Sequence, residues 1–86
     1  MDVSYAPTFI RQFKSLEKNL QEEVIEKIEL FRDRRNHRSL KVHRLTGRLA
    51  GRFSFSVNYK FRIVFFYLPS RSVVLLAVGD HDIYSV

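Results

Sequence analysis

Apolar residues in the first third of the chain recur at the spacing of two amphipathic helices. The apolar positions of the first pattern are Phe9, Phe13, Leu16 and Leu20, and those of the second are Val24, Ile28 and Phe31. Pro7 suits the first turn of a helix because it has no N–H to leave unpaired. Asn19, with Glu22 three positions later, is a candidate N-cap for the second helix. The pattern predicts an antiparallel helical hairpin.

From Arg52 onward, the apolar residues recur with a period of two, which is typical of half-buried strands. The apolar positions of two such strands are Phe53, Phe55 and Val57, then Phe61, Ile63 and Phe65. Val73 to Val78 is uniformly apolar, as in a strand covered on both faces, and Val3 to Tyr5 is a short β-prone start. The sequence therefore predicts an α+β fold of order β-α-α-β-β-β, in which the helical hairpin packs on a mainly antiparallel four-stranded sheet.

Length and composition limit the kind of protein. The 86 residues suffice for one modest core, and 45% of them are hydrophobic, so we expect one domain spanning residues 1–86. The absence of cysteine excludes disulfides, thiolate metal sites and cysteine nucleophiles. The longest apolar runs are far shorter than the ~20 residues that span a bilayer, and no basic-then-apolar leader opens the sequence. We expect a soluble, cytoplasmic protein with no membrane partner.

The charge is divided unevenly along the chain. Residues 1–31 carry four basic and six acidic side chains, a net charge of −2, whereas residues 32–62 carry ten basic side chains and one acid, a net charge of +9. A cationic surface of this density attracts polyanions by releasing their counterions. The distribution indicates a nucleic acid or an acidic protein as partner.

A basic segment with two glycines, Lys41 to Arg52, precedes the first of the alternating strands. Its cations are Lys41, Arg44, Arg48 and Arg52, and its glycines are Gly47 and Gly51. In one interpretation, the glycines provide positive φ angles in a loop and the cations are merely solvated. In the other, the glycines let the loop lie close to a phosphate backbone, which the cations bind.

Arg62 is a charged residue between two apolar ones and should project from the sheet face away from the helices. It has a structural interpretation, in which it pairs with Asp80 or Asp82. Alternatively, its planar and permanently charged guanidinium would hold a scissile phosphate and stabilise the charge of the transition state. The two roles are geometrically compatible.

Histidine titrates near neutral pH, so the three histidines are candidate proton carriers. His37 lies in a charged loop, His43 precedes the glycines, and His81 follows the last strand, with Tyr84 three residues later. Each also has a structural interpretation. RNA cleavage needs only a base for the 2′-hydroxyl and an acid for the leaving 5′-oxygen. We therefore expect no cofactor and no metal, since no carboxylates at ligand spacing accompany the histidines.

Three segments share their order and spacing with a known family. They are His43 to Arg52, with the pattern H-x-L-x-G-x-L-x-G-R, Tyr59 to Phe65, and Val78 to Tyr84. Together they resemble the RelE/ParE superfamily of bacterial toxins from type II toxin–antitoxin systems, over essentially the whole chain. The ending is especially similar to the RelE, YoeB and YafQ branches, which are ribosome-dependent messenger RNA endonucleases.

The resemblance implies roles for individual residues. His43 and His81 resemble two catalytic histidines of the YafQ-like pattern, and Arg62 resembles the strand arginine of the RelE and YoeB patterns. Tyr84 resembles an aromatic residue near the C-terminus that stacks on a base or assists proton transfer. The positions expected to bind RNA are Lys41, Arg44, Arg48, Arg52 and Lys60.

One departure from the family changes the expected proton path. Ser54, Ser56 and Lys60 stand where the YafQ-like pattern has Asp, His and Asp. The details of proton transfer therefore do not carry over from that pattern.

The leading hypothesis is a toxin that binds the ribosomal A site and cleaves the message, an mRNA interferase. The alternatives are a ParE-like toxin that poisons DNA gyrase without using the histidines, and a plain nucleic-acid-binding module. The implied partners are mRNA, the ribosome and a cognate antitoxin, in an assembly such as a toxin–antitoxin heterotetramer. Val64, Phe66 and Leu68 share a strand face with Arg62 and form an apolar strip, which an antitoxin or another part of the chain would cover.

Overall fold

The computed structural model describes residues 1–84, apart from the side chain of His81. Within these residues, the helices are α1 (Pro7–Lys14) and α2 (Lys18–Phe31), and the strands are β1 (Asp2–Tyr5), β2 (His43–Arg44), β3 (Phe53–Ser56), β4 (Arg62–Leu68) and β5 (Ser72–Gly79). Short 3₁₀ turns are η1 (Arg34–Asn36), η2 (Gly47–Leu49) and η3 (His81–Tyr84). No helix in this part of the chain is long and apolar enough to cross a membrane.

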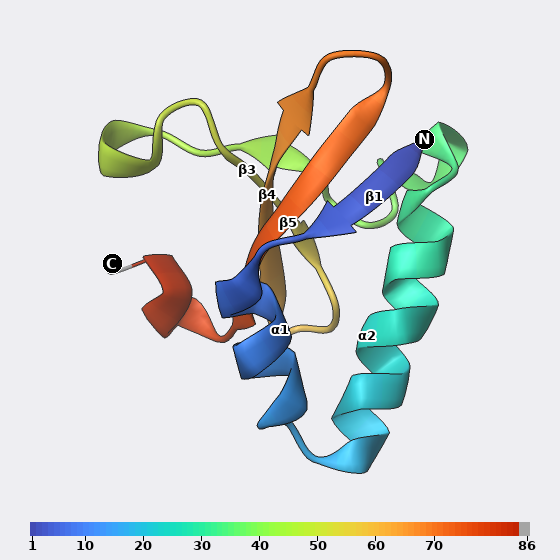
Figure 1. Ribbon diagram of the computed structural model, residues 1–86, viewed down its shortest axis with the longest axis vertical. Coiled ribbons are helices and arrows are strands. Elements are labelled where there is room, and N and C mark those ends of the chain that lie inside the picture. Colours follow the sequence, from blue (N-terminus) through green and yellow to red (C-terminus); the bar gives the residue numbers. More distant parts are fainter. Residues whose placement is uncertain (85–86) are drawn as a thin grey trace.

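The strands form one sheet in the order β1-β5-β4-β3-β2. β1 pairs with β5 in parallel, and the other neighbours are antiparallel. The α+β fold with a mainly antiparallel sheet is confirmed (Figure 1). The described sheet has five strands rather than the expected four, because β2 also joins it. Two residues are too few to show a period-two pattern, so the sequence could not mark β2.

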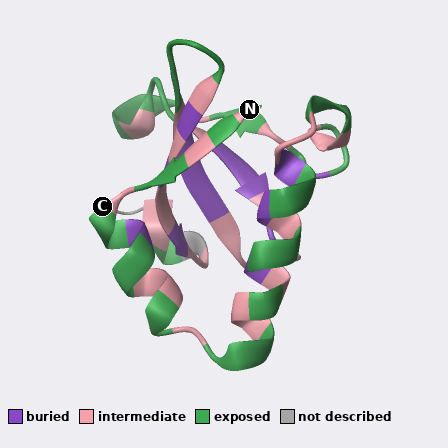
Figure 2. Cartoon of the chain, turned by 45° about the vertical axis from the view of Figure 1, so that its right-hand side comes forward, coloured by how far each residue is buried: buried purple, intermediate pink, exposed green. Residues whose placement is uncertain are grey.

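The helical hairpin covers one face of the sheet and contributes Phe9, Val24, Ile28 and Phe31 to the buried core. Phe31 of α2 is fully buried and stacks on Phe55 of β3 with 4.3 Å between ring centroids, and it meets Phe65 of β4 edge-on at 4.8 Å. Figure 2 shows the buried residues on the central strands and on the helix sides that face them. Each such aromatic ring contributes about 1.5–3 kcal/mol through burial, which holds the sheet against the helices.

The second helix begins earlier than expected. Asn19 is not its N-cap, since α2 starts at Lys18 and Glu17 occupies the cap position without a side-chain cap hydrogen bond. The reason is the tight link between the helices, where the Gln21 amide donates a 2.9 Å hydrogen bond to the Phe13 carbonyl at the end of α1. This bond draws the start of α2 toward α1.

Two irregular segments, residues 45–52 and η3, lie beside the sheet on the side away from α2 (Figure 1). η3 lies close to the sheet because Gly79 has no side chain, and a Cβ atom at this position would collide with the Ile83 side chain. Gly47 and Gly51 have φ angles of +67° and +90°, so the expectation that they provide positive φ angles in the loop is confirmed.

Candidate functional site

Strand register places two predicted site residues, His43 and Arg62, on the sheet face opposite the helices, which we call the site face. His43 lies opposite Ser54, Ser54 opposite Val64, and Val64 opposite Ala77. Directly opposed residues of antiparallel strands point to the same face, so these four side chains form a row across the sheet. Arg62 belongs to the neighbouring row, between Ser56 and Gly79.

His43 is exposed on the site face, and a backbone carbonyl fixes its tautomer. Its Nδ1 lies 2.9 Å from the carbonyl oxygen of Lys41. A carbonyl can only accept, so Nδ1 carries the proton and Nε2 of the neutral ring keeps its lone pair. Lys41 has a φ of +59°, a conformation that non-glycine residues adopt rarely. The turn before β2 thus leaves Nε2 able to take up a proton.

Tyr84 is anchored in the middle of the row. Its hydroxyl lies 2.7 Å from the hydroxyl of Ser54, which is completely buried. The preceding residue, Ile83, packs where Gly79 leaves room for it. The two contacts hold the C-terminal turn over the site face at Ser54, the residue that pairs with His43. The backbone of His81 begins this turn, and its side chain lies outside the described residues, so its role stays a prediction.

The guanidinium of Arg62 is held by backbone carbonyls rather than by an acid. Its Nη1 donates to the carbonyl oxygens of Asn58 and Phe61. Within the described residues, neither Asp80 nor Asp82 pairs with it, and its Nε and Nη2 make no hydrogen bond. Its full positive charge and a pair of adjacent donors therefore remain available, which is the arrangement that binds a phosphate in bidentate fashion.

Asn58 fixes the turn that orients Arg62. Its Oδ1 accepts from the backbone N–H groups of Lys60 and Phe61 at 2.9 and 2.8 Å, and its Nδ2 donates to Glu23 of α2 at 2.8 Å. This Asx-type turn sets the position of the carbonyls that bind the guanidinium. Asn58 ties the site to the helical layer.

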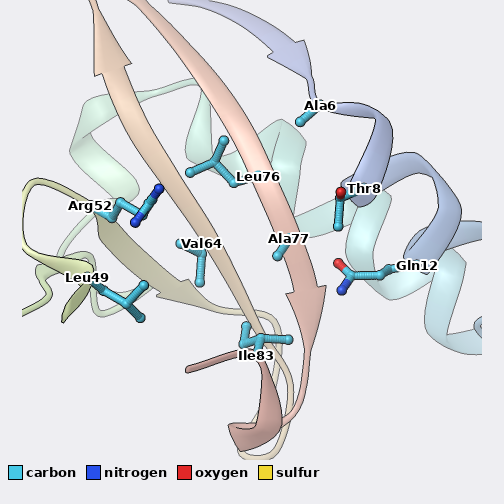
Figure 3. A pocket seen from close by; sticks show the side chains of 9 residues that line it. All are labelled: Ala6, Thr8, Gln12, Leu49, Arg52, Val64, Leu76, Ala77 and Ile83. Carbon is cyan, nitrogen blue, oxygen red and sulfur yellow. The ribbon is translucent and has the colours of Figure 1, made fainter. Parts of the chain in front are cut away.

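The structure separates the cations that were expected to bind RNA. Arg52 lies on the site face (Figure 3), Arg48 is exposed in η2, and Lys41 lies in the turn two residues before β2. Arg44 lies on the other face of β2, with its guanidinium 5.8 Å from the centre of the Phe53 ring. Lys60 lies in the turn after β3, near Glu17 and Glu23. Arg44 and Lys60 are thus not brought together with the row.

The described part of the chain pairs few of its cations. Its ion pairs are Lys27–Glu26, Arg32–Glu29 and Arg35–Asp33. The hydrogen bond from Arg35 lowers the pKa of Asp33 from 3.8 to about 2, so Asp33 stays ionised and offsets one charge of its own loop. None of the cations expected at the site is neutralised in this way within the described residues.

His37 has a structural role. Its ring stacks on Phe31 with 4.7 Å between centroids, and its Nε2 donates to the Phe31 carbonyl at 2.7 Å. It anchors the loop after α2 and lies in the helical layer, as its position in the charged loop indicated. Among the described side chains, no three histidine, aspartate or glutamate residues come together as metal ligands.

A hollow of about 340 Å³ adjoins the row (Figure 3). Its floor is formed by Val64, Leu76 and Ala77. Arg52 and Leu49 lie on one side of it, Thr8 and Gln12 of α1 on the other, and Ile83 at its lower end. A β-bulge explains the floor, because Val64 pairs with Ala77 and Phe65 with Leu75, which leaves Leu76 unpaired. Two consecutive β5 side chains therefore line the same hollow.

Sequence reasoning missed the residues that act by positioning others. Gln12 gave no signal, and Ser54 stood out only as a departure from the YafQ-like pattern, because their partners, Val78 and Tyr84, are 66 and 30 residues away in the chain. Asn58 was recognisable as a turn residue, since asparagine caps turns with its own side chain. The hydrogen bonds that it accepts from Lys60 and Phe61 form only once the hairpin has folded. Tertiary contacts create these roles.

Three solved structures illustrate what the chain is similar to. A RelBE2 toxin–antitoxin complex from Mycobacterium tuberculosis has a TM-score of 0.73 at 22% identity, over 93% of this chain and 96% of that one. YafQ from E. coli has a TM-score of 0.74 at 16% identity, over 96% of both chains. A YoeB–YefM complex from Staphylococcus aureus has a TM-score of 0.73 at 15% identity, over 94% and 97%.

Sequence comparison adds no relative to these. No protein-family model matches the chain, and no curated protein matches it. The likeness to the solved structures nevertheless extends over nearly the full length of both partners in each case. The chain therefore has the fold of the RelE, YoeB and YafQ toxins of the RelE/ParE superfamily.

Proposed function

We propose that this chain is the toxin of a type II toxin–antitoxin system and cleaves messenger RNA on the ribosome at the site face. The observation that carries the proposal is the set of groups in two neighbouring rows of the site face: a histidine with an available Nε2 and an anchored tyrosine at Ser54, and in the next row an arginine with unused donors. The full-length likeness to RelE, YafQ and YoeB structures supports it.

In the proposed reaction, Nε2 of His43 takes the proton of a ribose 2′-hydroxyl. The 2′-oxygen then bonds to the adjacent phosphorus, and the bond from phosphorus to the 5′-oxygen of the next nucleotide breaks. Arg62 binds the phosphate and stabilises the charge that develops on its oxygens. An acid returns a proton to the leaving oxygen, for which we nominate His81, with Tyr84 assisting. The products are a 2′,3′-cyclic phosphate and a 5′-hydroxyl end.

The proposed protein partner is an antitoxin. Two of the similar structures are complexes of a toxin with its antitoxin, and a further YoeB–YefM complex is described as heterotetrameric. In this chain, Val64 of the apolar strip is buried, Phe66 is half-buried and Leu68 is exposed. The outer end of the strip is therefore available to an apolar partner segment.

The test is cleavage by purified protein on translating ribosomes, mapped by primer extension. His43→Gln keeps a side-chain N–H that can donate to the Lys41 carbonyl but cannot take up the 2′-hydroxyl proton. We expect it to cut the message about 10²–10⁴ times more slowly, the usual contribution of a general base. Because His43 is exposed, the melting temperature should not change.

The same preparation separates the alternatives. Undiminished cleavage by His43→Gln would contradict the assignment of the base. No cleavage by the wild-type chain, together with inhibition of gyrase supercoiling, would instead support the gyrase-poisoning alternative.

A further inference from the structure

We propose that the hollow beside the row is a binding site for one nucleobase of the RNA, and that Gln12 of α1 reads the edge of this base. The inference rests on the proposed cleavage of RNA at the site face. Beyond the cleavage itself, it identifies where the protein selects the nucleotide that lies next to the scissile phosphate.

The hollow is continuous with the reacting groups. Val64 forms part of its floor and pairs with Ser54, which binds Tyr84, and Ile83 at its lower end is the residue before Tyr84. Ala77 lies two strands from Ser54, which is roughly 10 Å at the usual strand spacing. The base of the nucleotide at the cleaved bond, or of the next nucleotide, could span this distance and enter the hollow.

The shape and lining of the hollow fit a flat heteroaromatic ring. Its floor consists of aliphatic side chains, and its volume of about 340 Å³ falls at the lower end of the range for small-ligand pockets. Arg52 on one side (Figure 3) carries a planar guanidinium, which stacks on bases. An apolar anchor of a protein partner would use the floor but neither Arg52 nor Gln12.

Gln12 is the polar group that distinguishes one base from another. Its Oε1 accepts a 2.9 Å hydrogen bond from the backbone N–H of Val78, which fixes the orientation of the amide. Its Nε2 makes no hydrogen bond within the described residues and lies at the hollow (Figure 3). A fixed N–H donor selects a base that presents an acceptor, such as a ring carbonyl, at this point.

Gln12→Glu inverts this preference with little change in shape. The carboxylate still accepts from the Val78 N–H, while the donor becomes an acceptor. Lys14→Gln is the matched control, because it changes the charge of the same helix by the same amount and Lys14 faces the groove between the helices. Ala77→Leu is a second variant, which fills the hollow from its floor.

Binding is measured by NMR with trinucleotides that lack the attacking 2′-hydroxyl, so the measurement does not depend on cleavage. In the wild type, the methyl signals of Leu76, Ala77 and Ile83 should shift, most strongly with bases that carry a carbonyl acceptor. Gln12→Glu should change the ranking of the bases by roughly threefold to tenfold, the effect of one hydrogen bond. Ala77→Leu should abolish the preference, and Lys14→Gln should preserve it.

Two outcomes would overturn the inference. In the first, none of the trinucleotides shifts these methyl signals. The inference fails in this case even if an antitoxin peptide does shift them. The other is a base ranking that Gln12→Glu does not alter. If the trinucleotides bind as described but the wild type cleaves no message, the proposed function fails while the base site stands.

Discussion

Backbone carbonyls orient the candidate reactive side chains of this protein. The Lys41 carbonyl holds Nδ1 of His43, and the carbonyls of Asn58 and Phe61 hold the guanidinium of Arg62. A carbonyl carries no net charge, so it orients each group without neutralising it. A carboxylate partner would have satisfied the same donors but reduced the attraction for a phosphate. Both side chains are therefore oriented and remain chemically available.

The planar pair of donors on the Arg62 guanidinium, and not only its charge, should contribute to the cleavage rate. Arg62→Lys keeps the charge but loses the planar pair of donors, so we expect cleavage between that of the wild type and that of Arg62→Ala. Arg62→Ala should reduce the cleavage rate by about 10²–10³, as for loss of a donor to transition-state charge. Single-turnover cleavage of a defined message measures both variants.

Arg34→Ala is the control for this series, because Arg34 is an exposed arginine of η1, outside the row. It should cleave at nearly the wild-type rate. Equal rates for Arg62→Lys and the wild type would show that only the charge is needed and would contradict bidentate binding.

Residue types and their order predicted only part of the site. His43 and Arg62 could be nominated because a titratable or permanently charged side chain in a strand seldom serves core packing. Arg44 was nominated with them, and its side chain lies on the other face of β2 because it follows His43 directly in a strand. Ser54 and Gln12 could not be nominated, since each acts through one distant partner that only the folded chain supplies.

Among the elements, η3 decides whether Tyr84 reaches the row. Its position depends on Gly79, where any side chain would meet Ile83, and on the bond between Tyr84 and Ser54. A glycine at the end of a strand usually marks only the end of that strand. Here the missing side chain creates the space into which the turn folds.

Gly79→Ala should therefore displace η3 and slow cleavage about tenfold or more, because misplacement by about an ångström costs up to 10²-fold. Gly79→Ala combined with Ile83→Ala removes the collision and should recover much of the lost rate. Cleavage kinetics and the melting temperature measure the two effects separately. A Gly79→Ala protein that cleaves normally would show that the position of η3 is unimportant.

Periodicity predicted the long elements well and the short ones poorly. β3 and β4 lie where the two-residue pattern indicated, and β5 lies at the uniformly apolar run. α1 contains Phe9 and Phe13 but ends at Lys14, so the helical pattern was wrong to include Leu16 and Leu20 in the first helix. β2 and η3 contain too few buried residues to produce a recognisable hydrophobic period. They depend on contacts with the rest of the sheet. These two short elements carry His43 and Tyr84.

At the scale of the whole molecule, an aromatic core packs against the helix-facing side of the strands that carry the candidate site. Phe31, Phe55 and Phe65 pack between the helices and the sheet, and β3 and β4 carry Ser54 and Arg62 on their other side. The aromatic core thus lies on one face of the sheet and the candidate site on the other. The fold is shared by proteins with very different sequences, so the site and not the fold argues for the reaction.

Phe31→Ala should lower the free energy of unfolding by about 3–5 kcal/mol, the usual range for a deleted core aromatic ring. This loss is a large fraction of the stability of a small domain. Tyr59→Ala is the control, because Tyr59 is 90% exposed and should change stability by less than about 0.5 kcal/mol. Urea unfolding followed by circular dichroism measures both, and equal losses would contradict the described core.

In the proposed reaction, the site face cleaves RNA through the 2′-hydroxyl. The most direct measurement uses ribosomes programmed with a message that carries one 2′-deoxynucleotide at a mapped cleavage position. We expect cleavage to stop at that position alone, while the unmodified message gives fragments with a 2′,3′-cyclic phosphate and a 5′-hydroxyl. Cleavage at the 2′-deoxynucleotide at the normal rate would contradict attack by the 2′-hydroxyl.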